Sequence, residues 1–110
     1  MKITLPDQIK LYFDKASLGN PTFIFIHGGG GDTSHLAPQF YFFARRGTAI
    51  NLDLRGYGKS DKPMKYSTIA QYADDVAYLC RQLKITSPII VGHSMGGMVA
   101  VELAAKHPML

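Results

Sequence analysis

The stretch Ile89-Ile90-Val91-Gly92-His93-Ser94-Met95-Gly96-Gly97 decides the fold of this chain. A short apolar run rich in β-branched residues ends at a glycine, a serine follows, and two more glycines precede a pattern typical of a helix. This order predicts a strand, a sharp turn and a helix, with the Ser94 hydroxyl at the tip of the turn. A serine in that position is a candidate nucleophile.

Glycines flank the serine two residues before it, at Gly92, and two residues after it, at Gly96. A strand and a helix joined by so tight a turn run close together, and we expect side chains at these two positions to collide. The turn should also hold Ser94 in a strained backbone conformation. The helix that follows presents its N-terminal amides, including that of Met95, to a developing oxyanion. His93 points a different way, and we interpret it as a packed or hydrogen-bonded side chain, not as the base.

Length and composition indicate one globular domain: 110 residues, 46% hydrophobic and 18% charged. The net charge is +4, but the basic residues are scattered and the densest spot is Arg45-Arg46, so we expect a solvated surface and no nucleic-acid partner. The single cysteine, Cys80, excludes an internal disulfide and is expected to be a small buried hydrophobe. With no apolar run long enough for a membrane span and no apolar signal region, we expect a cytoplasmic protein without a membrane partner.

Two short extended runs around Pro6-Asp7, residues 3–5 and 9–13, predict an N-terminal β-hairpin. Strands and helices then alternate: strands over 22–26, 48–54 and 88–94, and helices from Ser34 or His35 to Gly47, from Thr68 to Leu83, and from Met95 to Lys106. This alternation predicts an α/β fold, a mostly parallel sheet with helices on both faces. Ligands bind such sheets beyond the carboxyl ends of the strands.

The helix after Thr68 has two local signals. Thr68 and Gln71 form a capping box, in which the hydroxyl accepts a backbone amide and the glutamine reaches back. One apolar stripe then predicts the buried face, made by Ile69, Tyr72, Val76, Leu79 and Leu83. In the preceding helix, we interpret the aromatic run 40–43 as core and helix surface rather than as a pocket.

The glycine loop His27-Gly28-Gly29-Gly30-Gly31 is compatible with three interpretations. Glycines let a backbone amide point into an oxyanion hole without obstruction. Dinucleotide binding is the second, with Asp53 as the ribose-binding acid, although the G-x-G-x-x-G spacing fails here. A plain flexible loop is the third. No cofactor and no metal site is predicted, because the four histidines lack a paired spacing with cysteine or carboxylate: His27, His35, His93 and His107.

Three ordered motifs, FIFIHGGGG (23–31), NLDLRGYGKSDKP (51–63) and IIVGHSMGGMVAVELAAKHP (89–108), are similar to those of a known family. With them the chain resembles the α/β-hydrolase superfamily, in the branch of small esterases, C–C hydrolases, lactonases and cofactor-free haloperoxidases. The resemblance implies that Ser94 is the nucleophile and that the amides of Met95 and Gly29, with Gly30 as the alternate, form the oxyanion hole. It implies a structural role for the loop 53–56 at the border of the site.

The chain departs from this family after the serine. The family places an acid and then a histidine after later strands, whereas only Glu102 and His107 follow Ser94 here. Both lie on the helix that starts at the serine, about 12 and 20 Å along its axis, too far for a hydrogen bond. The resemblance therefore implies that residues 1–110 are the N-terminal part of a single α/β-hydrolase domain, truncated after the nucleophile helix, without the later strands, the lid, the acid and the histidine.

The expected function is that of a serine hydrolase acting on a small-molecule carboxylic ester or a related acyl or C–C bond. The 110 residues themselves are expected to be inactive, because the general base is missing. The alternative is a non-catalytic, hydrolase-like binding module or a fragment. Since the strand at Ile89–Val91 would have an open edge, we also expect an oligomer or a partner segment to pair with it.

Overall fold

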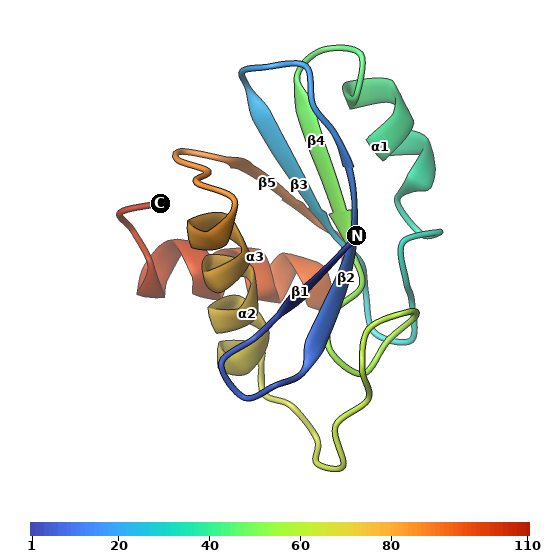
Figure 1. Cartoon of the computed structure of the whole chain (residues 1–110), viewed down its shortest axis with the longest axis vertical. Helices are drawn as coiled ribbons and strands as arrows, with labels where there is room; N and C mark the ends of the chain where they lie inside the picture. Colours follow the sequence, from blue (N-terminus) through green and yellow to red (C-terminus); the bar gives the residue numbers. More distant parts are fainter.

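The computed structural model describes all residues from Met1 to Leu110 and contains five strands and three helices (Figure 1). In chain order they are β1 (Lys2–Thr4), β2 (Lys10–Ala16), β3 (Thr22–Ile26), α1 (Ala37–Phe43), β4 (Thr48–Leu52), α2 (Ile69–Gln82), β5 (Ile89–Gly92) and α3 (Met95–Lys106). Strands β4 and β5 each end two residues before the predicted boundary. The predicted order of elements is otherwise the observed one.

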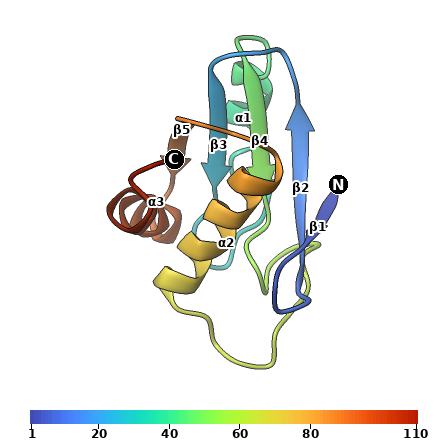
Figure 2. The same ribbon diagram turned by 60° about the vertical axis from the view of Figure 1, so that its left-hand side comes forward.

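The strands form one mixed sheet in the order β1-β2-β4-β3-β5. Strands β3, β4 and β5 are parallel, with Ile26 opposite both Leu52 and Gly92, while the hairpin β1–β2 joins the sheet antiparallel to β4. The α/β class and the N-terminal hairpin are thus confirmed. Because β3, β4 and β5 run the same way, their carboxyl ends and the three loops that follow them meet at one end of the sheet (Figure 2).

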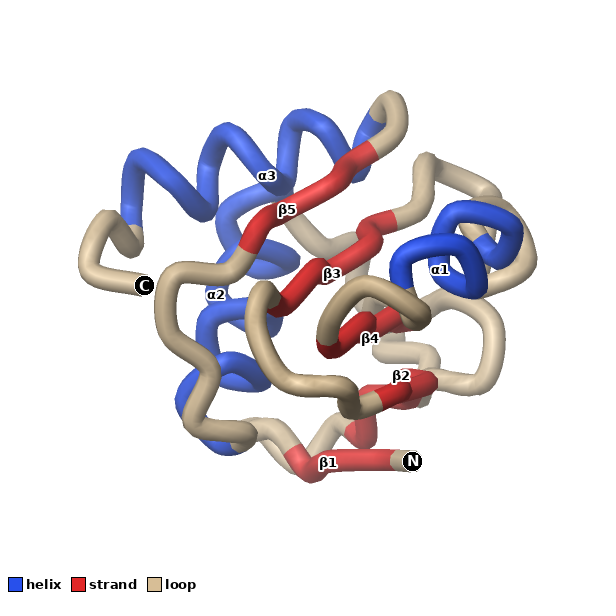
Figure 3. Tube along the Cα trace, turned by 90° about the horizontal axis from the view of Figure 1, so that it is seen from above, coloured by secondary structure: helices blue, strands red, loops and turns tan.

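Helices cover both faces of the sheet, as predicted: α1 lies on one side, and α2 and α3 lie on the other (Figure 3). The core under α2 and α3 contains sixteen buried side chains, among them Ile24, Ile50 and Leu52 from the central strands. The core under α1 is smaller and largely aromatic, with Phe40 packed on Phe23 and Phe25. Cys80 is fully buried in the larger core, as expected, and burial raises the pKa of its thiol to about 11.

Helix α1 is shorter than predicted, because Pro38 sits in its first turn. Proline has no N–H to donate and clashes with the preceding turn, so a helix that began at Ser34 or His35 would carry Pro38 too deep inside it. The residues before the helix form a turn instead, in which the Asp32 carboxylate accepts the Ser34 amide at 2.8 Å. Of the aromatic run, Phe40 is buried while Tyr41 and Phe42 are exposed, which fits core and helix surface.

Helix α2 buries the middle of its predicted stripe, while Ile69 and Leu83 at the two ends are partly buried, and half of its predicted cap is present. The Thr68 hydroxyl accepts the Gln71 amide at 3.1 Å, as expected. The Gln71 side chain does not reach back to complete the box, because its amide nitrogen donates to Asp75 at 2.9 Å. The buried carboxylate of Asp75 is a strong acceptor for this nitrogen, and the bond turns the Gln71 side chain away from the Thr68 N–H that its oxygen would accept in the box.

Strand β5 forms one edge of the sheet and pairs only with β3. Beside it, α3 is apolar on nearly all sides, and yet Ile89 of β5 is 47% exposed and Val101 of α3 is 70% exposed. The open edge of this strand is as predicted from the sequence, and the exposed apolar face of α3 beside it is an addition from the structure. None of the three helices combines the length and the apolar character that a membrane crossing requires.

Candidate active site

Ser94 stands at the turn between β5 and α3 with φ 54° and ψ −116°. Positive φ is uncommon for a residue with a side chain and stores backbone strain, which the surrounding structure must enforce. The residue is exposed, and its hydroxyl caps no amide of α3. The side chain predicted to be the nucleophile is therefore held above the carboxyl end of the sheet with a free hydroxyl.

The two flanking glycines leave no room for a side chain. A Cβ added to Gly92 would lie 2.2 Å from the carbonyl oxygen of Gly96, and one added to Gly96 would lie 2.0 Å from that of Ile26. The predicted collision is confirmed, and at Gly96 the obstacle is the neighbouring strand β3 rather than β5. A Cβ on Gly97 would meet nothing closer than 3.6 Å. Close packing of backbone on backbone thus enforces the strained turn.

The first turn of α3 leaves its first amide, that of Met95, without a hydrogen bond in the chain. The amides of Gly96, Gly97 and Met98 donate to carbonyls of His93 and Ser94 at 2.9 to 3.2 Å. The Met95 amide is outside this set of bonds. A helix N-terminus carries a partial positive charge, which favours a negative oxygen at this place.

The glycine loop after β3 lies directly against this turn. A Cβ on Gly28 would stand 3.4 Å from the Ser94 Cβ, and one on Gly29 would stand 3.7 Å from the Met95 sulfur. The backbone amides of Gly29 and Gly30 donate to no acceptor in the chain. The structure thus brings together Ser94, Met95 and Gly29, the three residues that the sequence singled out, while their catalytic roles stay predictions.

His27 is fully buried beneath the glycine loop and makes two hydrogen bonds. Its Nε2 accepts the Leu54 amide at 3.0 Å, and its Nδ1 lies 2.7 Å from the Gly28 carbonyl oxygen. Since a carbonyl only accepts, Nδ1 carries the proton and the ring is neutral. Burial lowers the pKa of His27 in agreement with this state. From the sequence, His27 was placed at the start of the glycine loop and excluded as a metal ligand, and these two hydrogen bonds were not predicted, although its place between a buried strand and a glycine loop was a signal.

Asp53 links the loops that follow β3 and β4. Its side chain is buried, and its two oxygens accept the amides of Thr33 at 2.7 Å and of Lys59 at 2.9 Å. Asn51 adds a bond from its side-chain nitrogen to the Thr33 carbonyl oxygen at 2.8 Å. Both carboxylate oxygens of Asp53 are therefore engaged within the protein, which agrees with a structural role and not with binding of a ribose.

Arg55 is the centre of a buried ion-pair network that the sequence did not reveal. Its Nε and Nη2 donate to Asp75 at 2.6 and 2.9 Å, and its Nη1 donates to Asp7 at 2.7 Å. The bonds to Asp75 raise the pKa of Arg55, whereas burial raises the pKa of Asp75 against the opposing effect of Arg55. The sequence signal for this network was Asp75, a charged residue on the buried side of α2.

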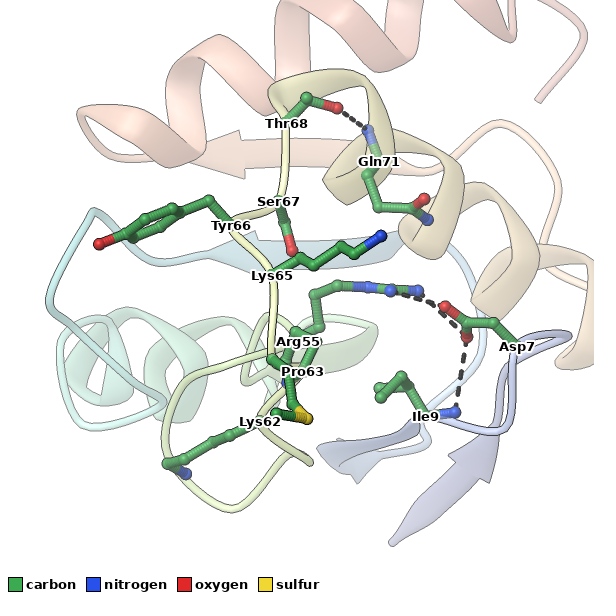
Figure 4. Close-up of a pocket in the computed structure, with 11 residues that line it drawn as sticks. Asp7, Ile9, Arg55, Lys62, Pro63, Lys65, Tyr66, Ser67, Thr68 and Gln71 are labelled. Carbon is green, nitrogen blue, oxygen red and sulfur yellow. Dashed lines mark hydrogen bonds and ion pairs between the residues drawn. The ribbon is translucent and has the colours of Figure 1, made fainter.

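This network lies beside a hollow of about 560 Å³ under the loop 62–68, away from Ser94 (Figure 4). The guanidinium of Arg55 points across the hollow toward Asp7 from the turn after β1, and Gln71 lies above it. Both carboxylates already neutralise Arg55, so the charges of this hollow that have no ion-pair partner are those of Lys62 and Lys65.

The remaining candidate bases are placed elsewhere. His107 Nε2 lies 2.9 Å from Asp74 Oδ1, a hydrogen bond that lowers the pKa of Asp74, and it sits at the opposite end of α3 from Ser94. His93 was expected to be packed or hydrogen-bonded, which is wrong: its side chain is exposed, and its ring meets that of His35 edge-on at 6.3 Å. No cluster of three or more potential ligand side chains could hold a metal ion.

Comparison with known proteins identifies the family. A family model described as the alpha/beta hydrolase fold matches residues 21–109. The chain belongs to the α/β hydrolase family. The match includes the glycine loop, the Asp53 loop and the whole Ser94 turn.

Proteins similar to this α/β hydrolase carry names of different activities. A 2-(acetamidomethylene)succinate hydrolase of Mesorhizobium japonicum is 40% identical over 82% of this chain. An acetyltransferase component of the acetoin cleaving system of Cupriavidus necator is 37% identical over 93% of the chain. The solved structure of Est816, described as an N-acyl homoserine lactone degrading enzyme, covers 96% of the chain with a TM-score of 0.91 and 34% identity. The chain spans 32%, 27% and 40% of these proteins, respectively.

Proposed function

We propose that this α/β hydrolase is a serine hydrolase of a small-molecule carboxylic ester, or of a related acyl or C–C bond, with Ser94 as its nucleophile. One observation carries the proposal: a free serine hydroxyl on a strained turn lies beside two free backbone amides, those of Met95 and Gly29. The names of two relatives, a hydrolase and a lactone-degrading enzyme, support hydrolysis of a small molecule. We also propose that it acts in the cytoplasm and requires no cofactor.

The reaction follows from the placement of these groups. Ser94 Oγ attacks the substrate carbonyl carbon, and the carbonyl electron pair moves to oxygen, where the Met95 and Gly29 amides stabilise the negative charge. The Gly30 amide is the alternate second donor. When the carbonyl re-forms, the C–O bond to the leaving group breaks, its electron pair goes to the leaving oxygen, and a base from outside these residues delivers to that oxygen the proton it took from Ser94 Oγ, so that the alcohol leaves and an acyl group stays on Ser94. Water then attacks this acyl-enzyme, which releases the acid and restores the hydroxyl.

The proton of Ser94 has no acceptor within hydrogen-bond distance in these 110 residues. His107, the one histidine paired with a carboxylate, is bound to Asp74 at the far end of α3. Loss of the base from a catalytic triad lowers activity by several orders of magnitude. We therefore propose that residues 1–110 form the N-terminal part of a single hydrolase domain, whose acid and histidine come from later elements, and that these residues alone turn over substrate feebly.

Selective labelling with a fluorophosphonate tests the role of Ser94. The reagent forms a bond from Oγ to phosphorus, and fluoride leaves. Intact-mass measurement with peptide mapping should find Ser94 labelled at least about ten times faster than Ser67, a loop serine without the two amides. Ser94→Ala should abolish the signal and Ser67→Ala should leave it unchanged. Equal labelling of the serines would reject the nucleophile and favour a non-catalytic, hydrolase-like binding module.

We propose further that the open edge of β5 pairs with another strand, from a second copy or from a partner segment. The unpaired backbone groups of β5 and the exposed side chain of Ile89 in this strand support this. Light scattering should show oligomers of the 110-residue protein, and Ile89→Lys should reduce them, while Met64→Lys, at an exposed apolar side chain outside the sheet, should not. A monodisperse monomer with a cooperative melt would contradict the proposal.

A further inference from the structure

The carbonyl group of Gly28 is held by two donors. His27 Nδ1–H donates to it at 2.7 Å, and the Gly31 amide donates to it at 3.1 Å, which closes the four-residue turn 28–31. Gly30, third in this turn, has φ 75°, as a type II turn requires. The plane of the peptide that joins Gly28 to Gly29 is thus fixed from one side.

Fixing this carbonyl also fixes the amide at the other end of the same peptide. In a planar trans peptide, C=O and N–H point in opposite directions. The Gly29 N–H therefore points away from His27 and Gly31, and it donates to no acceptor in the chain. Ser94 and Met95 lie against this backbone. A Cβ built on Gly28 would be 3.4 Å from the Ser94 Cβ, and one built on Gly29 would be 3.7 Å from the Met95 sulfur.

We propose that His27 is a positioning residue, which holds the Gly28–Gly29 peptide so that the Gly29 amide, rather than that of Gly30, faces the oxyanion formed at Ser94. This inference rests on the proposed role of Ser94. His27 does not touch the substrate, since it is fully buried below the loop. The Leu54 amide enforces the required tautomer, because its bond to Nε2 at 3.0 Å leaves the proton on Nδ1. The orientation of one oxyanion donor is thereby linked to the end of β4.

Two variants separate the two bonds of His27. In His27→Asn the side-chain nitrogen stands near the place of Nδ1 and can still donate to Gly28. In His27→Gln the side-chain oxygen stands near the place of Nε2 and can still accept the Leu54 amide. Removal of an oxyanion donor costs about 10²–10³ in rate. We expect the rate of Ser94 labelling by fluorophosphonate to stay within about threefold of wild type in the Asn variant and to fall about tenfold or more in the Gln variant.

A merely structural role predicts another result, namely labelling that follows the free energy of unfolding of each variant. Equal labelling by both variants, or slower labelling by the Asn variant, would overturn the inference. If the wild type does not label Ser94 at all, the proposed function fails first. Nitrogen-15 NMR then still tests His27: wild type should show a proton on Nδ1, and the Gly29 amide shift should move in the Gln variant and not in the Asn variant. A proton on Nε2 of the wild type would overturn the inference even if neither variant folds.

Discussion

The loops after β3 and β4 and the turn after β5 lie at the same end of the sheet but are held by different forces. Buried polar side chains fix the two loops: His27 and Asp53 each bridge from one loop to the other, and Arg55 ties the second loop to α2. The Ser94 turn has no such bridge. Backbone packed on backbone at Gly92 and Gly96 holds it.

This difference shows how each region fails. A polar bridge fails when a partner is removed, because the buried group that remains loses its hydrogen bond. The glycine-packed turn fails when atoms are added, because nothing around it can yield. The arrangement also suits the proposed chemistry, in which rigid amides meet the charge while the serine keeps a free hydroxyl.

The largest expected effect is at the polar bridge of α2. Asp75→Ala leaves the buried guanidinium of Arg55, 6% exposed, without its two-point partner. Breaking a buried ion pair in this way should lower the free energy of unfolding by about 3–5 kcal/mol. Urea denaturation measures it. Asp74→Ala is the matched control, since its partners Lys106 and His107 are both partly exposed and such pairs contribute about 1 kcal/mol or less. Equal losses of unfolding free energy in the two variants would contradict the claim that the Arg55–Asp75 pair matters more because it is buried.

The second effect is at the turn. In Gly96→Ala the new Cβ would stand 2.0 Å from the Ile26 carbonyl oxygen, so β3 and α3 must separate. We expect a loss of about 2–3 kcal/mol in denaturant unfolding, as for other overpacked sites. Gly97→Ala adds the same methyl group to the next position with free space around it. There the better helix propensity should stabilise by about 0.5–1 kcal/mol. If Gly96→Ala were as stable as Gly97→Ala, packing would not be what holds the turn.

The same difference explains what could be predicted from the sequence. The requirement for glycine acts between neighbours, so the spacing around Ser94 revealed both the turn and the positions of its collisions. The polar bridges join residues far apart in the chain: 27 positions for His27 and Leu54, and 48 for Arg55 and Asp7. Their partners become neighbours only after the strands have paired. The predicted start of α1 was wrong although its signal is local, because Pro38 belongs in the first turn of a helix and so indicates a start at Ala37.

A smaller effect is expected at the exposed start of α2. Thr68→Ala removes the one side-chain cap of this helix and should cost about 1 kcal/mol. Thermal or urea denaturation against Thr86→Ala, the same chemical change at an exposed loop position, isolates the cap. Gln71 connects the cap to the buried ion pair: its backbone amide donates to Thr68, and its side chain donates to Asp75, the partner of Arg55. A loss as large as that of Asp75→Ala would mean that the start of α2 is part of the bridge.

The smallest effect is a dependence of stability on pH that comes from His27. Burial is the main reason for its lowered pKa; Asp53 and Asp32 oppose it and His35 adds to it. Below about pH 6.5 the unfolded chain takes up a proton that folded His27 resists. Stability from this residue is therefore complete above that pH and decreases as the pH falls toward the folded pKa.

Urea denaturation at steps from pH 7.5 to 5 should show this decrease as a difference between wild type and His27→Gln. The other three histidines remain in both proteins and cancel in the difference. A charged ring would hold protons on both nitrogens, so the Leu54 amide would lose its acceptor while the bond to Gly28 survives. Acid should thus loosen the end of β4 before it releases the glycine loop, and hydrogen exchange of the Leu54 amide should rise at a higher pH than that of Gly31. Parallel stability curves for the two proteins would mean that the folded ring takes up the second proton as readily as the unfolded chain does, and burial would then not lower the pKa of His27.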